Sequence, residues 1–116
     1  MIERFYSGER DDTLAVRDGN GPKRPLHNRF DYRVHMTERA RLAPRARLAF
    51  DLLADALDNH VPTREVHDYF VRRIVPLLPE RFTISRSRVR AYVERIADEQ
   101  RAAIKFEEVT DQSVKK

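Results

Sequence analysis

The chain has 116 residues, a formal net charge of +4, 36% charged residues and no cysteine. This length suits one domain, and the missing cysteines exclude disulfides, thiolate-bound zinc and cysteine nucleophiles. No apolar run approaches the roughly 20 residues of a transmembrane helix, and the first residues lack a signal-peptide pattern. We therefore expect a soluble cytoplasmic protein that does not contact a membrane.

Two short apolar runs near the start of the chain predict a β-hairpin. Phe5-Tyr6 and Leu14-Ala15-Val16 flank a polar segment that contains a glycine, a pattern typical of two strands joined by a turn. The sequence Asp18-Gly19-Asn20-Gly21-Pro22 then favours a tight turn, because Gly and Asn tolerate left-handed backbone. Polar and apolar residues alternate over residues 29–35, which predicts a third strand.

A repeating apolar stripe predicts the first long helix. The apolar side chains of residues 48–57 recur with i, i+3, i+4 spacing, and Pro44 stands where a proline is tolerated in the first turn. Asp51, Asp55 and Asp58 fall on the opposite side of this helix. We expect a solvated acidic face there, with metal binding or phosphate mimicry as the alternatives.

Two further helices are predicted in the second half of the chain. Pro62 stands near the start of one, which Pro76 should end or kink because proline removes a backbone donor. Residues 82–84 are β-prone and are expected to be extended. Ser85 is a favourable N-cap for a last helix that we expect to end near Ile104.

Together these elements predict an α+β fold, in which a small N-terminal antiparallel β-sheet packs on three α-helices. Residues 1–106 would form the single α+β domain. Residues 107–116 are largely polar and would form a C-terminal tail, because chain ends are poorly ordered unless they dock on the fold.

Four segments share their order with a known family. They are Arg4-Phe5-Tyr6-Ser7-Gly8-Glu9-Arg10, the step from Arg29 to Asp31, Leu42-Ala43-Pro44 before Leu48-Ala49-Phe50-Asp51-Leu52-Leu53, and Leu77-Leu78-Pro79 before Phe82-Thr83-Ile84-Ser85. Over residues 4–97 the chain resembles an uncharacterised family of small phage- and plasmid-borne domains. Where that family has a stretch rich in glycine and aromatic residues, this chain has Met36-Thr37-Glu38-Arg39-Ala40-Arg41. The resemblance implies an α+β fold and a mobile-element origin, and it implies no reaction.

Arginine supplies 19 of the 23 basic residues and is unevenly distributed. Residues 17–47 hold nine basic residues against three acidic ones, whereas residues 51–68 hold five acidic residues and one arginine. A second basic cluster, at residues 85–90, lies at the start of the last predicted helix. Separate basic and acidic blocks favour binding to a large charged partner, and genomic base composition is the alternative source of the arginine excess.

The two basic clusters provide the candidate binding residues. A guanidinium group donates paired hydrogen bonds to phosphates and carboxylates, and we expect the clusters to converge on one outward-facing basic region. For each cluster, a solvated surface is the alternative. The candidate residues are Arg39, Arg41, Arg45, Arg47, Ser85, Arg86, Ser87, Arg88 and Arg90.

No catalytic motif is present: the chain lacks a P-loop, a nucleophile elbow, a dinucleotide-binding glycine motif and a zinc-binding histidine pair. We therefore expect no enzyme activity, metal or cofactor. The first hypothesis is a phage or mobile-element interaction protein that binds a host protein or nucleoprotein complex, with inhibition of host defence as one role. The alternative is a small DNA-binding regulator whose recognition helix follows Ser85 and meets phosphates and base edges. Neither hypothesis fixes the oligomeric state.

Overall fold

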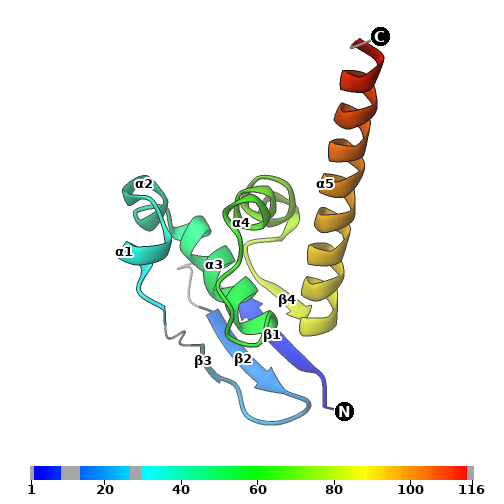
Figure 1. Cartoon of the computed structure of the whole chain (residues 1–116). Helices are drawn as coiled ribbons and strands as arrows, with labels where there is room; N and C mark the ends of the chain where they lie inside the picture. The colour runs from blue at the N-terminus through cyan, green and yellow to red at the C-terminus, as the bar shows by residue number, and fades with distance from the viewer. Residues whose placement is uncertain (1, 9–13, 27–29, 115–116) are drawn as a thin grey trace.

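One antiparallel sheet of four strands, in the order β3-β2-β1-β4, forms the base of the molecule, and the helices lie on one side of it (Figure 1). The computed structural model describes residues 2–8, 14–26 and 30–114, with side chains as far as Arg101. The α+β fold class predicted from the sequence is confirmed.

The sheet is built on the predicted hairpin. β1 (Arg4–Gly8) pairs with β2 (Leu14–Asp18); the connecting residues 9–13 lie outside the described part of the chain. The predicted turn follows, with Gly19 at a φ of 56°, and leads to the short β3 (Arg24–Pro25). β4 (Phe82–Ser85) pairs with the other edge of β1, so the segment expected to be extended forms an edge strand.

Alternate residues of the strands face the helices. Tyr6, Val16 and Ile84 are buried on this face and join the main core. Gly8 is paired with Phe82 across the sheet, and a Cβ on Gly8 would lie only 2.0 Å from a ring carbon of Phe82. The ring of Phe82 therefore occupies the space that any larger residue at this position would need.

The third predicted strand is wrong, because residues 32–35 form the helical turn α1 (Tyr32–His35) instead; Arg29, where that strand was to begin, lies outside the described residues. Asp31 caps the turn by accepting a backbone N–H two residues later at 2.9 Å. The ring of Tyr32 packs edge-on against Phe50, with centroids 5.8 Å apart. The alternating aromatic residues therefore contact a helix, and this segment does not pair in the sheet.

The central helix is α3 (Pro44–Ala56), which follows the short α2 (Glu38–Arg41). It begins at the proline that the sequence predicted. Its apolar stripe, which includes Leu52 and Leu53, is fully buried between the sheet and the later helices.

The second predicted helix is broken into three turns: α4 (Arg64–Tyr69), the π-helical turn η1 (Phe70–Ile74) and the 3₁₀ turn η2 (Val75–Leu77). The Thr63 hydroxyl caps α4 by accepting a backbone N–H at 3.2 Å. Pro76 lies in η2, so the predicted break at this proline is confirmed.

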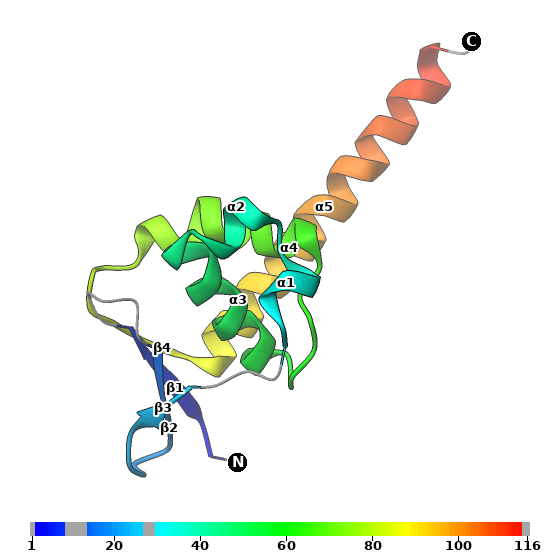
Figure 2. The ribbon, with the colours of Figure 1, turned by 90° about the vertical axis from the view of Figure 1, so that its left-hand side faces the viewer.

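The last helix, α5 (Arg86–Val114), begins at the predicted cap, since the Ser85 hydroxyl accepts the Arg88 backbone N–H at 3.2 Å. In the first half of this helix, the side chains of Val89 and Ile96 are buried in the core. The helix then continues past Ile104 and projects from the rest of the molecule (Figures 1 and 2). With this helix included, the molecule extends 62 Å along its longest axis. In the described part of the chain, no helix has the length and apolar character needed to cross a membrane.

Candidate binding surfaces

The first turn of α5 is bound to its own fold. Ser87 donates its backbone N–H and its hydroxyl to the carboxylate of Glu3 at 3.2 and 2.6 Å, respectively. These hydrogen bonds lower the pKa of the Glu3 carboxyl. Glu3 therefore occupies the place at the helix N-terminus where a phosphate would bind. Because β4 leads directly into α5, a helix-turn-helix is not formed here.

Two of the three arginines at the start of α5 hold the end of α3. Asp58, in left-handed backbone with a φ of 57°, forms ion pairs with Arg86 and with Arg90, the latter at 2.9 Å. Arg90 also donates its Nε–H to the Ala56 carbonyl at 2.6 Å. The last carbonyls of a helix lack partners within it and carry its negative dipole end. Arg86 and Arg90 thus cap α3 and are engaged within the fold.

Arg88 is the member of this cluster that stays available. Its side chain is exposed, and its guanidinium lies 6.0 Å from the centroid of the Tyr92 ring. It forms no hydrogen bond or ion pair through its side chain with the residues that the structure describes. This arginine therefore keeps its charge uncompensated at the surface.

The other predicted cluster is largely unpaired. Arg39, Arg45 and Arg47 are exposed, and their side chains make neither hydrogen bonds nor ion pairs to described residues. The Nε of Arg41 is enclosed and has no hydrogen-bond partner among these residues. Leu42, between them in the chain, is 76% exposed. We call these residues the α2–α3 basic surface: Arg39, Arg41, Leu42, Arg45 and Arg47.

Local capping and one buried histidine position this surface. The Thr37 hydroxyl accepts the Ala40 backbone N–H at 3.2 Å and starts α2. Ala43, the N-cap residue of α3, makes no side-chain capping hydrogen bond, and the first turn of α3 has no acidic residue, so no side chain of that turn offsets the positive helix end. The buried His67 of α4 donates from Nε2 to the Ala46 carbonyl at 2.8 Å. This bond holds the start of α3, and hence its arginines, against α4.

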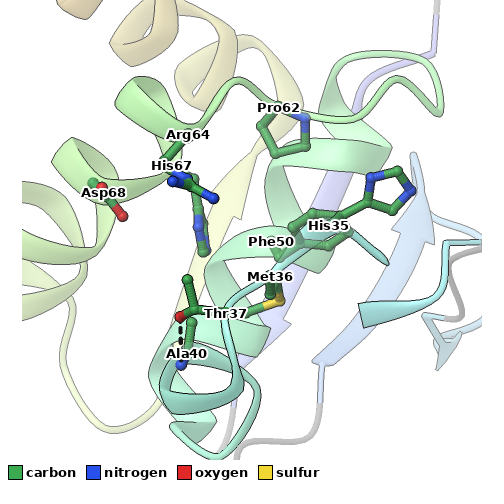
Figure 3. A pocket seen from close by; sticks show the side chains of 9 residues that line it. All are labelled: His35, Met36, Thr37, Ala40, Phe50, Pro62, Arg64, His67 and Asp68. Atoms are coloured by element: carbon green, nitrogen blue, oxygen red, sulfur yellow. Dashed lines mark hydrogen bonds between the residues drawn. The ribbon is translucent and has the colours of Figure 1, made fainter. Parts of the chain in front are cut away.

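A hollow of about 300 Å³ lies behind α2, between it and α4 (Figure 3). Thr37 lines one side, and Arg64 and Asp68 of α4 line the other. His35 stacks on the Phe50 ring, with centroids 6.2 Å apart. Over the described residues, no group of three or more His, Cys, Asp or Glu side chains could hold a metal ion. The polar side chains of Thr37, Arg64 and Asp68 give this hollow hydrogen-bonding groups beside the basic surface.

The two predicted clusters do not converge. Arg45 and Arg47 lie in the first turns of α3, whereas Arg86 and Arg90 hold its opposite end. A helix of 13 residues spans about 20 Å, and α2 and the start of α5 lie apart in both ribbon views (Figures 1 and 2). The expectation of one basic region is therefore wrong, because α3 separates the clusters.

The predicted acidic face of α3 is also not a solvated row. Asp55 has a side chain only 11% exposed, and it accepts hydrogen bonds from the Tyr6 hydroxyl at 2.6 Å and from Arg4 at 2.9 Å. Asp51 accepts the Tyr32 hydroxyl at 2.7 Å. These carboxylates bind partners of the same chain, since the sheet and α1 pack over this side of the helix.

One surface was not predicted from the sequence. A groove between the η1–η2 segment and α5 is lined by Arg73, Leu77 and Tyr92, and Leu77 is 73% exposed. The available signal was a leucine between Pro76 and Pro79, where a broken helix leaves an apolar side chain uncovered.

Comparisons with known proteins identify no relative of this chain. No family model matches it, and no curated protein or solved structure does so either. Its function therefore has to be inferred from the chemistry of these surfaces.

Proposed function

We propose that the chain is a non-enzymatic interaction protein that binds an acidic partner through the α2–α3 basic surface. The partner would be a host protein or nucleoprotein complex in the cytoplasm. The resemblance to phage- and plasmid-borne domains makes interference with host defence the role that we propose for this binding.

One observation carries this proposal. The fold engages Arg4, Arg86 and Arg90 with carboxylates, yet it leaves Arg39, Arg45 and Arg47 exposed and unpaired among the described residues. The first set serves stability, and the second set has no comparable use within the described part of the chain.

The exposed leucine favours a partner that contains protein. Leu42 is 76% exposed beside the unpaired arginines, and it offers an apolar contact that a phosphate backbone would not use. Arginine is enriched in the cores of protein interfaces, where an apolar centre is surrounded by a polar rim. An acidic protein surface would satisfy both the guanidinium groups and the leucine.

The DNA-binding alternative has less support. Its recognition helix would use Ser87, Arg86 and Arg90, but these side chains already bind Glu3 and Asp58. Contact with DNA would require these bonds to break. Of the predicted readout residues, Arg88 is the arginine that remains unpaired among the described residues.

A pair of charge-matched variants tests the proposal. The surface variant combines Arg39→Gln, Arg45→Gln and Arg47→Gln. The control variant combines Lys23→Gln, Arg72→Gln and Arg101→Gln, which are exposed positions elsewhere. Each variant removes three positive charges and lowers the net charge from +4 to +1.

Partners captured from lysate by the unaltered chain would be purified and their affinities measured for each variant. We expect the surface variant to bind at least about tenfold more weakly, the loss typical of removing interface hot spots. The control variant should bind as the unaltered chain does. Equal weakening of both variants would mean that binding follows net charge alone, and the proposal would then fail.

Binding to duplex DNA at two salt concentrations separates the alternative. We expect weak binding that ignores base sequence and falls steeply with salt, as phosphate contacts do. A preference for one DNA sequence over its scrambled form, eroded by Arg88→Ala, would instead support the regulator.

A further inference from the structure

Two adjoining hollows follow the side of α5 that faces η1, η2 and β4. One, of about 280 Å³, lies beside Tyr69 and Ile96, and the other, of about 340 Å³, lies beside Pro79. Both are lined by Leu77 and Tyr92. We call the continuous depression the α5 groove.

The floor of the α5 groove is apolar. Ile74 and Leu77 line both hollows, and Ile84 lines the second. Leu77 is 73% exposed, so an apolar side chain placed against it would remove further apolar surface from water. From Arg88 to Glu99 the groove follows α5 for about 16 Å at a rise of about 1.5 Å per residue, the length of a short peptide segment.

The rim of the groove is basic. The arginines among its lining residues are Arg73, Arg81, Arg88 and Arg95, and the carboxylate among them is Glu99. Glu99 already accepts the Tyr69 hydroxyl and pairs with Arg95 at 3.8 Å. The groove therefore joins an apolar floor to a rim with excess positive charge.

We propose that the α5 groove binds an acidic segment of a partner protein, which places a large apolar side chain against Leu77 and carboxylates against the rim arginines. Charge complementarity selects this occupant, since one engaged carboxylate faces several guanidinium groups. Helical segments with apolar anchors in such grooves are a recurring form of peptide recognition.

Single-stranded nucleic acid would use the groove differently, because its bases stack on exposed aromatic faces. Here the guanidinium of Arg73 lies 5.9 Å from the centroid of the Tyr69 ring. Arg88 lies similarly over Tyr92, whose ring also packs edge-on against Phe70 at 6.4 Å. With these rings engaged and an aliphatic floor, the groove suits a peptide better than a base.

The groove is separate from the α2–α3 basic surface, since α4 and η1 lie between α2 and α5 (Figure 1). This separation provides matched variants. Leu77 and Leu42 are the same residue type with similar exposure, 73% and 76%, and they belong to different surfaces. Each leucine can therefore be truncated with little effect on folding, and each serves as the control for the other.

The test uses a fluorescein-labelled peptide with glutamates on both sides of a leucine and a phenylalanine, followed by fluorescence anisotropy. Its counterpart with glutamine in place of glutamate reports the charge requirement. We expect saturable binding of the acidic peptide, weakened about tenfold by Leu77→Ala and about three- to fivefold by Arg88→Gln. Leu42→Ala and Arg72→Gln should leave the affinity unchanged.

Any one of four results would overturn this inference. The glutamine peptide could bind as well as the acidic one, or Leu42→Ala could weaken binding as much as Leu77→Ala. A labelled oligothymidine could bind with higher affinity and respond to Leu77→Ala. Sedimentation could also show self-association that Leu77→Ala abolishes, which would make a second copy the occupant. Because Leu42 and its arginines lie outside the groove, failure here leaves the proposed function standing.

Discussion

Removing the Tyr6 hydroxyl should destabilise the fold by a predictable amount. Tyr6 is 0% exposed, and its hydroxyl donates to Asp55 at 2.6 Å. A buried hydrogen bond to a charged group contributes about 1.5–3 kcal/mol. We therefore expect Tyr6→Phe to lower the free energy of unfolding by about 2 kcal/mol. For a domain of this size that loss lowers the melting temperature by roughly 8 °C.

The assay is urea denaturation followed by circular dichroism, run as a double-mutant cycle with Asp55→Ala. If the hydroxyl acts through this carboxylate, Tyr6→Phe should cost little once Asp55 is removed, with a coupling energy of about 1–2 kcal/mol. Tyr92→Phe is the control, because this hydroxyl has no partner among the described residues. An equal loss from Tyr6→Phe in both backgrounds would refute the assignment of its partner.

The same phenol predicts a pH dependence. Burial, reinforced by the hydrogen bond to Asp55, raises the pKa of Tyr6 above its usual value of 10.0. The unfolded chain ionises first as pH rises, so this stabilisation is complete below pH 10 and is lost progressively above it. The alkaline loss of stability should therefore be smaller in Tyr6→Phe than in the unaltered chain.

Three further substitutions test other parts of the fold. Hydrogen bonds from two arginines lower the pKa of Asp18 to about 2. This carboxylate should therefore stabilise the fold above pH 4 and lose the effect toward pH 2. The urea midpoint of Asp18→Asn should change less between pH 4 and pH 2 than that of the unaltered chain. Gly8→Ala should lower the free energy of unfolding by about 1–3 kcal/mol, because its methyl group would press on the Phe82 ring, and Phe82→Leu should recover part of the loss. Asp58→Asn removes the charge that holds Arg90, so amide exchange in the first turn of α5 should accelerate.

Much of the fold follows from short-range chemistry that is readable in the sequence. The hairpin, the helix beginning at Pro44 and the Ser85 cap each depend on neighbouring residues, and each was predicted. The prediction of a strand at residues 29–35 was wrong because the conformation there depends on a distant contact. The aromatic side chains of this segment pack on Phe50, a contact between segments whose meeting is set by the tertiary fold, and packing of this kind overrides local β-propensity.

The sites were harder to predict because residues far away in the sequence determine whether an arginine side chain is paired. Asp58 meets Arg86 and Arg90 across 28 and 32 residues of chain, and Glu3 meets Ser87 across 84. No local pattern distinguishes these side chains from Arg88 or Arg45. The sequence therefore located the basic clusters without showing which of their members are engaged.

Several carboxylates pair with arginines inside the fold, and other arginines at the surface are left without a carboxylate partner among the described residues. Asp18, Asp55 and Asp58 are drawn to arginines that join the sheet, α3 and α5, so they cannot offset charge elsewhere. Other arginines have no carboxylate partner among the residues that the structure describes, and they lie beside Leu42 on one surface and beside Leu77 on another. Each surface thus combines an unpaired guanidinium with an exposed apolar side chain, the combination that protein interfaces favour. The pairing that stabilises the fold also determines where a partner could bind.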